Sequence, residues 1–183
     1  MLFRSRDPGS AALAVKFMAA YKKPAVLDAD GINAFAGKAG ALKKRSPATI
    51  LTPHTGELAG LLDVPVSEVA AERLKHARAA ARKTGAVIVL KGSSTIITDG
   101  TITLLNPTGN PGLATAGSGD VLTGVIAALL AKGLDAIIAA GAGAFLHGLA
   151  ADIAADDLGQ DNLIASDLID YLPLAFASLG EEE

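Results

Sequence analysis

NPTGNPGLATAGSGDVLTGVIAALLAKG, residues 106–133, places a glycine-rich loop directly before a long apolar segment. Gly117 and Gly119 allow backbone angles that other residues avoid, and the apolar run from Gly117 to Lys132 predicts a helix. The first turn of a helix leaves several N–H groups without partners and carries roughly half a positive charge. The stretch therefore predicts an anion site at a helix N-terminus, suited to a phosphate group in transfer.

Asp120 lies in the first turn of this predicted helix. A carboxylate beside a phosphate repels it, unless the carboxylate takes a proton from a hydroxyl that attacks the phosphate. An acid in the first turn also stabilises a helix through the helix dipole. The loop alone leaves both interpretations open, a catalytic base and an ordinary capping acid.

Three apolar runs upstream of the loop predict strands, at residues 25–30, 48–54 and 86–91. Their nearly continuous apolar character is typical of strands covered on both faces in a parallel sheet. Residues 93–105 predict a hairpin, because Asp99-Gly100 between β-branched runs favours a tight turn. The fold class is therefore α/β, with helices on both faces of a mostly parallel central sheet.

Further helical segments surround these strands, and we expect one domain over residues 1–183. A helix that feeds a central strand at the start of the chain indicates either a domain that is incomplete at its N-terminus or an unusually small sheet. Besides the helix at 117–132, the predicted helices are 10–22 (with Leu13, Phe17, Ala20 and Tyr21 on one side), 55–62, 67–84 (with Ser67 as N-cap), 135–157 and 166–178.

The composition argues against several classes of protein. A net charge of −3 over 183 residues gives no electrostatic case for binding nucleic acid or an anionic membrane. The longest apolar region, residues 121–155, is interrupted by Lys132, Asp135 and His147, so we expect buried helices rather than a membrane span. The absence of cysteine excludes disulfides and thiolate metal sites, and it fits a cytoplasmic location.

The ends of the predicted strands carry the remaining candidate residues. In an open α/β sheet, ligands bind at the carboxyl ends of the strands. Gly92 after Lys91 allows close approach of a nucleotide, and Ser93, Ser94 and Thr95 offer hydroxyl and N–H groups to phosphate oxygens. The alternative for residues 91–95 is an ordinary turn after a strand.

Polar residues also follow the first two strands. If a helix starts at Thr55, Glu57 points from its first turn toward the pocket, and the alternative is a stabilising first-turn acid. Asp28 either shapes the pocket or caps the next helix, whereas a structural role is preferred for Asp30. His147, on an apolar helix, is interpreted as a buried core histidine and stays outside the predicted site.

Six sequence words together resemble one known family. NPTGNPGLAT at 106–115 is followed by GSGDVLTG at 117–124, which contains the GxGD anion-hole signature of the ribokinase superfamily. The other words are VLDADGIN at 26–33, TPHTGE at 52–57, LKGSSTIITDG at 90–100 and GAFLHGLAADIAA at 143–155. Taken in chain order, and with a resemblance that runs from about Asp7 onward, these words resemble those of the ADP/ATP-dependent (S)-NAD(P)H-hydrate dehydratases.

The resemblance implies a ribokinase-like three-layer α/β/α fold that lacks the N-terminal part of the domain. It implies dehydration of (S)-NAD(P)H hydrate to NAD(P)H, with ADP or ATP as co-substrate and Mg²⁺ as cofactor. Asp120 would be the catalytic base and contact the substrate, His54 would bind the hydrated dinucleotide, and Glu57 would organise Mg²⁺ through water. Gly117, Ser118 and Gly119 would form the anion hole, and Lys91, Gly92, Ser93, Ser94, Thr95 and Gly119 would bind the nucleotide.

The same resemblance implies a homo-oligomer, a tetramer by the family's habit, and an NAD(P)H-hydrate epimerase that is either fused or separate. Two other functions stay open at this point. A ribokinase-like kinase of a small alcohol or vitamin precursor would share Asp120 and the anion hole, although TPHTGE and NPTGNPGLAT argue against it. An inactive fragment or nucleotide-binding module is the other. The words do not choose between ADP and ATP.

Overall fold

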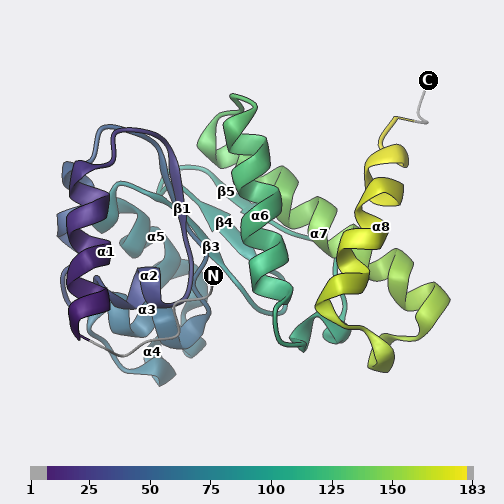
Figure 1. The fold of residues 1–183 in the computed structure, drawn as a ribbon. Helices are drawn as coiled ribbons and strands as arrows, with labels where there is room; N and C mark the ends of the chain where they lie inside the picture. Colours follow the sequence, from purple (N-terminus) through teal and green to yellow (C-terminus); the bar gives the residue numbers. More distant parts are fainter. Residues whose placement is uncertain (1–7, 181–183) are drawn as a thin grey trace.

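A computed structural model describes residues 8–180 of the chain (Figure 1). The strands are β1 (Ala25–Leu27), β2 (Thr49–Leu51), β3 (Val87–Leu90), β4 (Ile96–Thr98) and β5 (Thr103–Leu105). The α-helices are α1 (Pro8–Ala20), α2 (Asp30–Asn33), α3 (Thr55–Leu62), α4 (Val66–Ala71), α5 (Arg73–Thr84), α6 (Ser118–Ala131), α7 (Ala136–Leu158) and α8 (Ala165–Ala177). Short 3-10 helices are η1 (Ala39–Lys44), η2 (Pro111–Ala114) and η3 (Gln160–Asn162).

The five strands form one sheet in the order β1-β2-β3-β4-β5. β1, β2 and β3 are parallel, and their carboxyl ends therefore meet at one edge. The hairpin of β4 and β5 extends the sheet with antiparallel pairs. The three strands predicted to carry the site are thus the parallel part of a mixed sheet.

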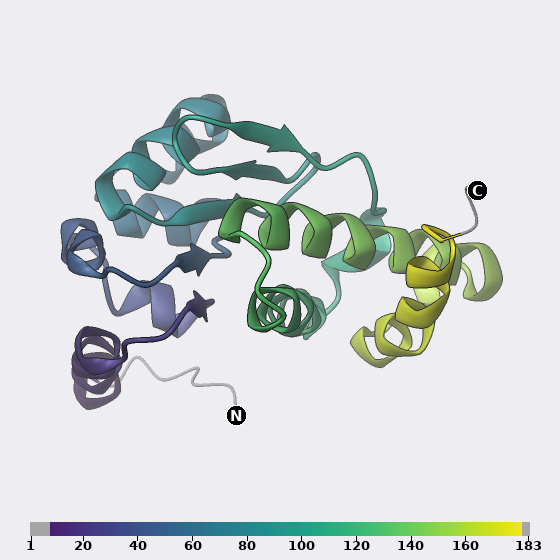
Figure 2. The same cartoon turned by 90° about the horizontal axis from the view of Figure 1, so that it is seen from above.

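Helices cover both faces of this sheet, as Figure 2 shows end-on. Strand side chains alternate between the faces with a period of two. Leu51, Ile88 and Leu90 are buried in one core with residues of α3 and α5. Their neighbours Ile50, Val87, Val89 and Ile97 are buried in the other core with residues of α6 and α7. The predicted three-layer α/β/α arrangement is confirmed.

Helix α7 is the central helix of the second core. It is long and apolar enough to cross a membrane by length and composition alone, but half of its most apolar window is buried inside the protein. Gly143 lets α6 approach closely, because a Cβ at this position would lie 2.5 Å from Cγ1 of Ile126. The expectation that this apolar region forms buried helices is confirmed.

Two local predictions were wrong. Residues 67–84 form two helices, α4 and α5, because Glu72 leaves the helical region at φ −131° and ψ 52°. Ser67 lies inside α4, and the N-cap is Pro65. The turn of the hairpin is four residues long rather than two, since Thr98 pairs with Thr103 and the carboxylate of Asp99 accepts the N–H groups of the two residues that precede Thr103.

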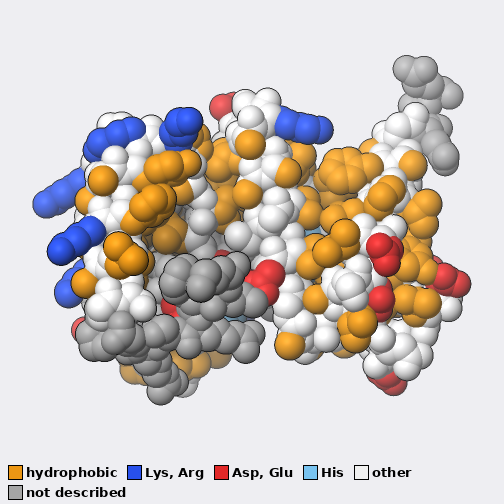
Figure 3. Space-filling model, viewed as in Figure 1, with side chains coloured by type: hydrophobic (Ala, Val, Ile, Leu, Met, Phe, Trp, Pro, Cys, Tyr) orange, Lys and Arg blue, Asp and Glu red, His pale blue; other side chains and the backbone are white. Residues whose placement is uncertain are grey.

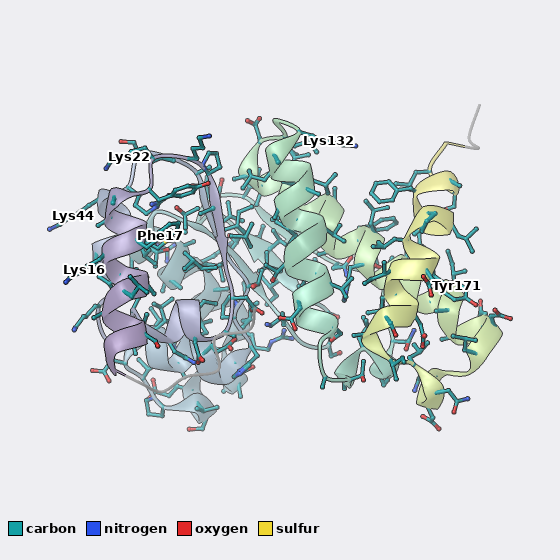
Figure 4. All side chains as sticks on the ribbon, viewed as in Figure 1. Lys16, Phe17, Lys22, Lys44, Lys132 and Tyr171 are labelled. Carbon is teal, nitrogen blue, oxygen red and sulfur yellow. The ribbon has the colours of Figure 1, made fainter. Side chains whose placement is uncertain are left out.

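Helix α1 forms where it was predicted, but its apolar side faces solvent. Leu13 and Phe17 are 64% and 56% exposed, and Met18 is the side chain of α1 that is buried. The ring of Phe17 stacks on that of Tyr21 with the centroids 5.1 Å apart. Figure 4 shows Phe17 on the outside of α1 near Lys16.

Candidate functional site

The first turn of α6 presents one free backbone donor. Gly117, the N-cap, has φ +93°, and no side chain caps the helix. The N–H of Asp120 donates to Gly117 O at 3.0 Å, and the N–H of Ser118 lies 3.4 Å from Thr115 O. Within residues 8–180, the N–H of Gly119 has no acceptor. An uncapped helix N-terminus with a free N–H is a suitable binding site for one oxygen of a phosphate.

The loop before α6 is tied to α7 by the NPTGNPG word. Asn106 Nδ2 donates to Ala144 O at 3.2 Å, and Asn110 Nδ2 donates to the Asp152 carboxylate at 3.0 Å. That carboxylate also accepts the N–H of Gly109 at 2.8 Å. The word therefore has a structural role: it holds the glycine-rich loop in one place against a buried helix.

The carboxylate of Asp120 is available for chemistry. Among the described residues it makes no hydrogen bond and no ion pair, and the side chain is partly exposed. It lines one end of an open groove of about 530 Å³. The groove runs along α6 and α8 past Leu129 and Phe176 to Lys132, and Figure 3 shows hydrophobic side chains on this face. Its lining is otherwise almost entirely apolar.

A polar cluster lies at the ends of the three parallel strands. Lys91 Nζ lies 2.7 Å from Asp28 Oδ1, and the same oxygen accepts a hydrogen bond from Thr52 Oγ1 at 2.7 Å. Glu57 Oε2 is 4.0 Å from the Lys91 ammonium. All three charged side chains are largely buried, with 23%, 14% and 9% of Lys91, Asp28 and Glu57 exposed. The topology thus gathers residues from β1, β2 and β3 around one cation.

Gly119 joins this cluster to the anion site. A Cβ at this position would lie 3.4 Å from Lys91 Nζ and 3.6 Å from Asp28 Oδ2. The Lys91 ammonium therefore lies directly against the first turn of α6. Asp28, for which the sequence left two roles open, is the carboxylate that holds this ammonium in place.

His54 is the N-cap of α3. Its Nδ1 accepts the N–H groups of Gly56 and Glu57 at 3.0 and 3.2 Å, so Nδ1 carries no hydrogen. Glu57 Oε2 accepts the N–H of His54 at 2.8 Å in return, which completes a capping box. The His54 side chain is 60% exposed, and its Nε2 lies 3.5 Å from Glu57 Oε1. Glu57 is therefore both a first-turn acid and a neighbour of Lys91.

The loop after β3 has unusual backbone angles and one external support. Gly92 has φ +142° and Ser94 has φ +53°, both in the region that favours glycine. The guanidinium of Arg73, the first residue of α5, donates to the carbonyls of Ser93, Leu90 and Lys91. Ser93 and Ser94 are exposed, so their hydroxyl groups are open to a ligand. Nothing local in the sequence marked Arg73 as part of this site.

His147 reaches the anion site from behind. It is 6% exposed, and its Nε2 lies 3.0 Å from the carbonyl oxygen of Ser118 in the first turn of α6. A carbonyl only accepts, so Nε2 carries the hydrogen. The pKa of His147 is lowered to about 4, chiefly by burial and also by the nearby Lys91 charge, whereas the Ser118 hydrogen bond acts in the opposite direction. The sequence identified a buried histidine but not its contact with the site.

The carboxylates fit a metal ion only when a ligand supplies further oxygens. No group of three or more His, Asp or Glu side chains within the described range could hold a metal by itself. Glu57 Oε2 already accepts a backbone N–H, and Asp28 Oδ1 is shared by Thr52 and Lys91. These residues suit an Mg²⁺ ion held mainly by nucleotide phosphates, with Glu57 and Asp28 as acidic neighbours.

Comparison with known proteins connects this geometry to one family. The family model described as NAD(P)H-hydrate dehydratase (Carb_kinase) matches residues 5–174. The bifunctional NAD(P)H-hydrate repair enzyme of Moorella thermoacetica is 46% identical over 180 residues, which cover 97% of this chain and 34% of that enzyme.

Solved structures give the same result. The ADP/ATP-dependent NAD(P)H-hydrate dehydratase of Bacillus subtilis, co-crystallised with ATP and Mg²⁺, superposes with a TM-score of 0.75 and 38% identity over 85% of this chain and 55% of that one. A ribokinase-like superfamily protein of Enterococcus faecalis has a TM-score of 0.72 and 28% identity over 93% of this chain and 60% of that one. The chain thus spans about a third to three-fifths of these relatives.

Proposed function

The chain belongs to the NAD(P)H-hydrate dehydratase family, and on that premise we propose that it takes part in the nucleotide-dependent dehydration of (S)-NAD(P)H hydrate. The phosphoryl donor is ADP or ATP, and the products are NAD(P)H, phosphate and AMP or ADP. The reaction repairs a nicotinamide ring to which water has been added. The setting is the cytoplasm, where NAD(P)H hydrates arise from the reduced cofactors in use.

One observation carries this proposal: the free N–H of Gly119 and the unpaired carboxylate of Asp120 lie in the same helical turn. The N–H and the helix dipole attract a phosphoryl group. Asp120 would be unfavourable beside that group if its only role were electrostatic. It is useful there as a base for a hydroxyl group that approaches the phosphorus atom.

The chemistry proceeds in two steps. Asp120 takes the proton of the ring hydroxyl while the hydroxyl oxygen attacks the terminal phosphorus of the nucleotide, and AMP or ADP departs. The hydroxyl has then become a phosphate ester. Phosphate leaves the ring far more readily than hydroxide, and loss of a proton from the neighbouring ring carbon restores the double bond. The N–H groups at Gly117, Ser118 and Gly119 stabilise the charge that develops on the phosphoryl oxygens.

The nucleotide approaches from the end of β3 in this proposal. Lys91 lies against Gly119, and the exposed residues Gly92, Ser93 and Ser94 and the partly buried Thr95 continue from it along the chain. Asp28, Glu57 and Asp120 supply three negative charges, against two positive charges on the Lys91 ammonium and the Arg73 guanidinium. Mg²⁺, held by the phosphates near Glu57, would supply the positive charge that a polyphosphate needs in these surroundings. The exposed ring of His54 would contact the hydrated dinucleotide.

Replacement of Asp120 by Asn tests the central step. Asp120→Asn removes the base and keeps the side-chain shape, so repair of hydrated NADH should fall by about 100- to 10,000-fold while Mg–ADP binding is retained. Recovery of the absorbance of the reduced ring measures repair, and calorimetry measures binding. Asp167→Asn is the matched control, because Asp167 is a first-turn acid of α8 whose carboxylate accepts the N–H of Ile164.

The products of the wild-type chain decide between the proposed function and its alternatives. Recovery of reduced cofactor together with free phosphate supports a dehydratase. A stable phosphate ester of a small alcohol would instead identify a kinase, and nucleotide binding without turnover would identify a binding module. Near-normal repair by the Asp120→Asn protein would remove Asp120 from the mechanism.

A further inference from the structure

We propose that His147 is a positioning residue that sets the orientation of the Gly119 N–H at the anion site. The proposal rests on the proposed function for the identity of the anion, a nucleotide phosphate. The geometry on which it depends is present in the protein without ligand. His147 does not reach the substrate in this proposal; it acts through the carbonyl of Ser118.

His147 contacts the first turn of α6 directly. His147 Nε2 donates to Ser118 O at 3.0 Å, and Ser118 is the first residue of α6. The peptide unit whose oxygen accepts this bond has the N–H of Gly119 at its other end. A peptide unit is planar, so fixing its oxygen also fixes the direction of its N–H. The imidazole therefore controls the one N–H of this turn that has no acceptor within the described chain.

Close packing holds helix α7 in place on both sides of His147. Gly143 packs against Ile126 of α6, and Gly148 packs against Thr108, which leaves no space for a side chain at residue 148. Leu146 and Ala150 on the same helix are buried. Because α7 is held in place, the imidazole fixes the position of the Ser118 carbonyl rather than adjusting to it.

The rest of the first turn of α6 does little to orient this peptide unit. Gly117, the N-cap, brings no side chain to α6, so no capping side chain orients the first turn. The hydroxyl of Ser118 donates to Leu113 O at 2.7 Å, which anchors the loop but not the peptide unit between Ser118 and Gly119. His147 adds a restraint to this peptide unit from inside the protein and leaves the outer side free for a ligand.

A set of three variants tests this role. His147→Leu removes the donor and keeps an apolar side chain of similar size, whereas His147→Gln keeps an N–H donor. His76→Leu is the matched control. His76 is also buried, at 8% exposure, but its Nδ1 contacts the carbonyl oxygen of Glu72, the N-cap of its own helix α5. The measurements are the dissociation constants of Mg–ADP and of inorganic phosphate, and the NMR order parameter of the Gly119 N–H without ligand.

The proposal predicts that His147→Leu weakens Mg–ADP and phosphate binding by about tenfold and lowers the order parameter of the Gly119 N–H. His147→Gln should bind within about twofold of the wild type with an unchanged order parameter, and His76→Leu should change neither quantity. Equal effects of His147→Leu and His147→Gln, or unchanged binding and order parameter in His147→Leu, would overturn the proposal. If the wild type binds no nucleotide, the proposed function fails, and the Gly119 order parameters alone still decide the role of His147.

Discussion

His147 also makes the folded chain sensitive to acid. Its pKa is lowered from 6.5 to about 4, chiefly by burial, so between these values the unfolded chain binds a proton that the folded chain does not. Stability is therefore full above about pH 6.5 and is lost as the pH falls toward 4. The loss amounts to about 2 kcal/mol at pH 5.

Urea unfolding at pH 7 and pH 5 measures this effect. The wild type should lose about 2 kcal/mol more than His147→Gln does between the two pH values, because glutamine does not titrate. The His76→Leu protein retains His147 and should lose as much as the wild type. An equal loss in the wild type and in His147→Gln would show that His147 does not titrate in this way.

Arg73 illustrates what one side chain does between two elements. From the start of α5 it donates to three carbonyls at the end of β3, beside the loop of residues 91–95. Arg73→Met keeps most of the apolar stem and removes these donors. We expect about three- to tenfold weaker Mg–ADP binding, because the loop loses its external support.

Calorimetric titration with Mg–ADP checks this expectation. Arg82→Met is a suitable control, since Arg82 lies on the same helix and donates to Gly100 O in the hairpin turn, at 3.2 Å. Its binding should match that of the wild type. Equal weakening in the two variants would mean that a general change in α5, rather than the contact with the strand end, is responsible.

The elements that could be predicted from the sequence are those whose signals are local. Helix α3 has the predicted bounds because His54 and Glu57 cap it from within four residues, and α6 follows directly from the glycine-rich loop before it. The break at Glu72 and the roles of Arg73 and Asp28 were not predictable in this way. Lys91 and Asp28 are 63 residues apart in the chain, and only the sheet brings them together.

Over the whole molecule, charge is distributed unevenly on the face shown in Figure 3. Figure 4 shows Lys16, Lys22 and Lys44 around α1, whereas Asp157 and Asp170 belong to α7 and α8. Figure 3 shows most basic side chains of this face by α1 and most acidic ones by α8, with a few charges between them. The groove between α6 and α8 lies on the same face. Two copies can pack through this face about a twofold axis that lies in the interface, perpendicular to the direction from the basic end to the acidic end. Each basic end then lies against an acidic end, and both grooves are covered.

We therefore expect concentration-dependent dimers that weaken with added salt. Phe176 lines the groove and is 46% exposed, so Phe176→Asp should weaken association by about tenfold or more. Sedimentation velocity over a range of concentrations and salt measures this. Ile102→Asp, at a 51% exposed position in the hairpin turn, should associate like the wild type. A monomer at every concentration, or the same loss in both variants, would contradict this arrangement.

The contact between Thr108 and Gly148 has a consequence for how related sequences diverge. Any side chain at residue 148 would occupy the space of the Thr108 hydroxyl and backbone, and this pair joins the glycine-rich loop to α7. A different residue at 108 would remove the hydroxyl but not the backbone atoms, so it could not make room for a methyl group at residue 148. A lineage that keeps this loop attached to α7 should therefore keep glycine at residue 148, whatever residue it carries at 108.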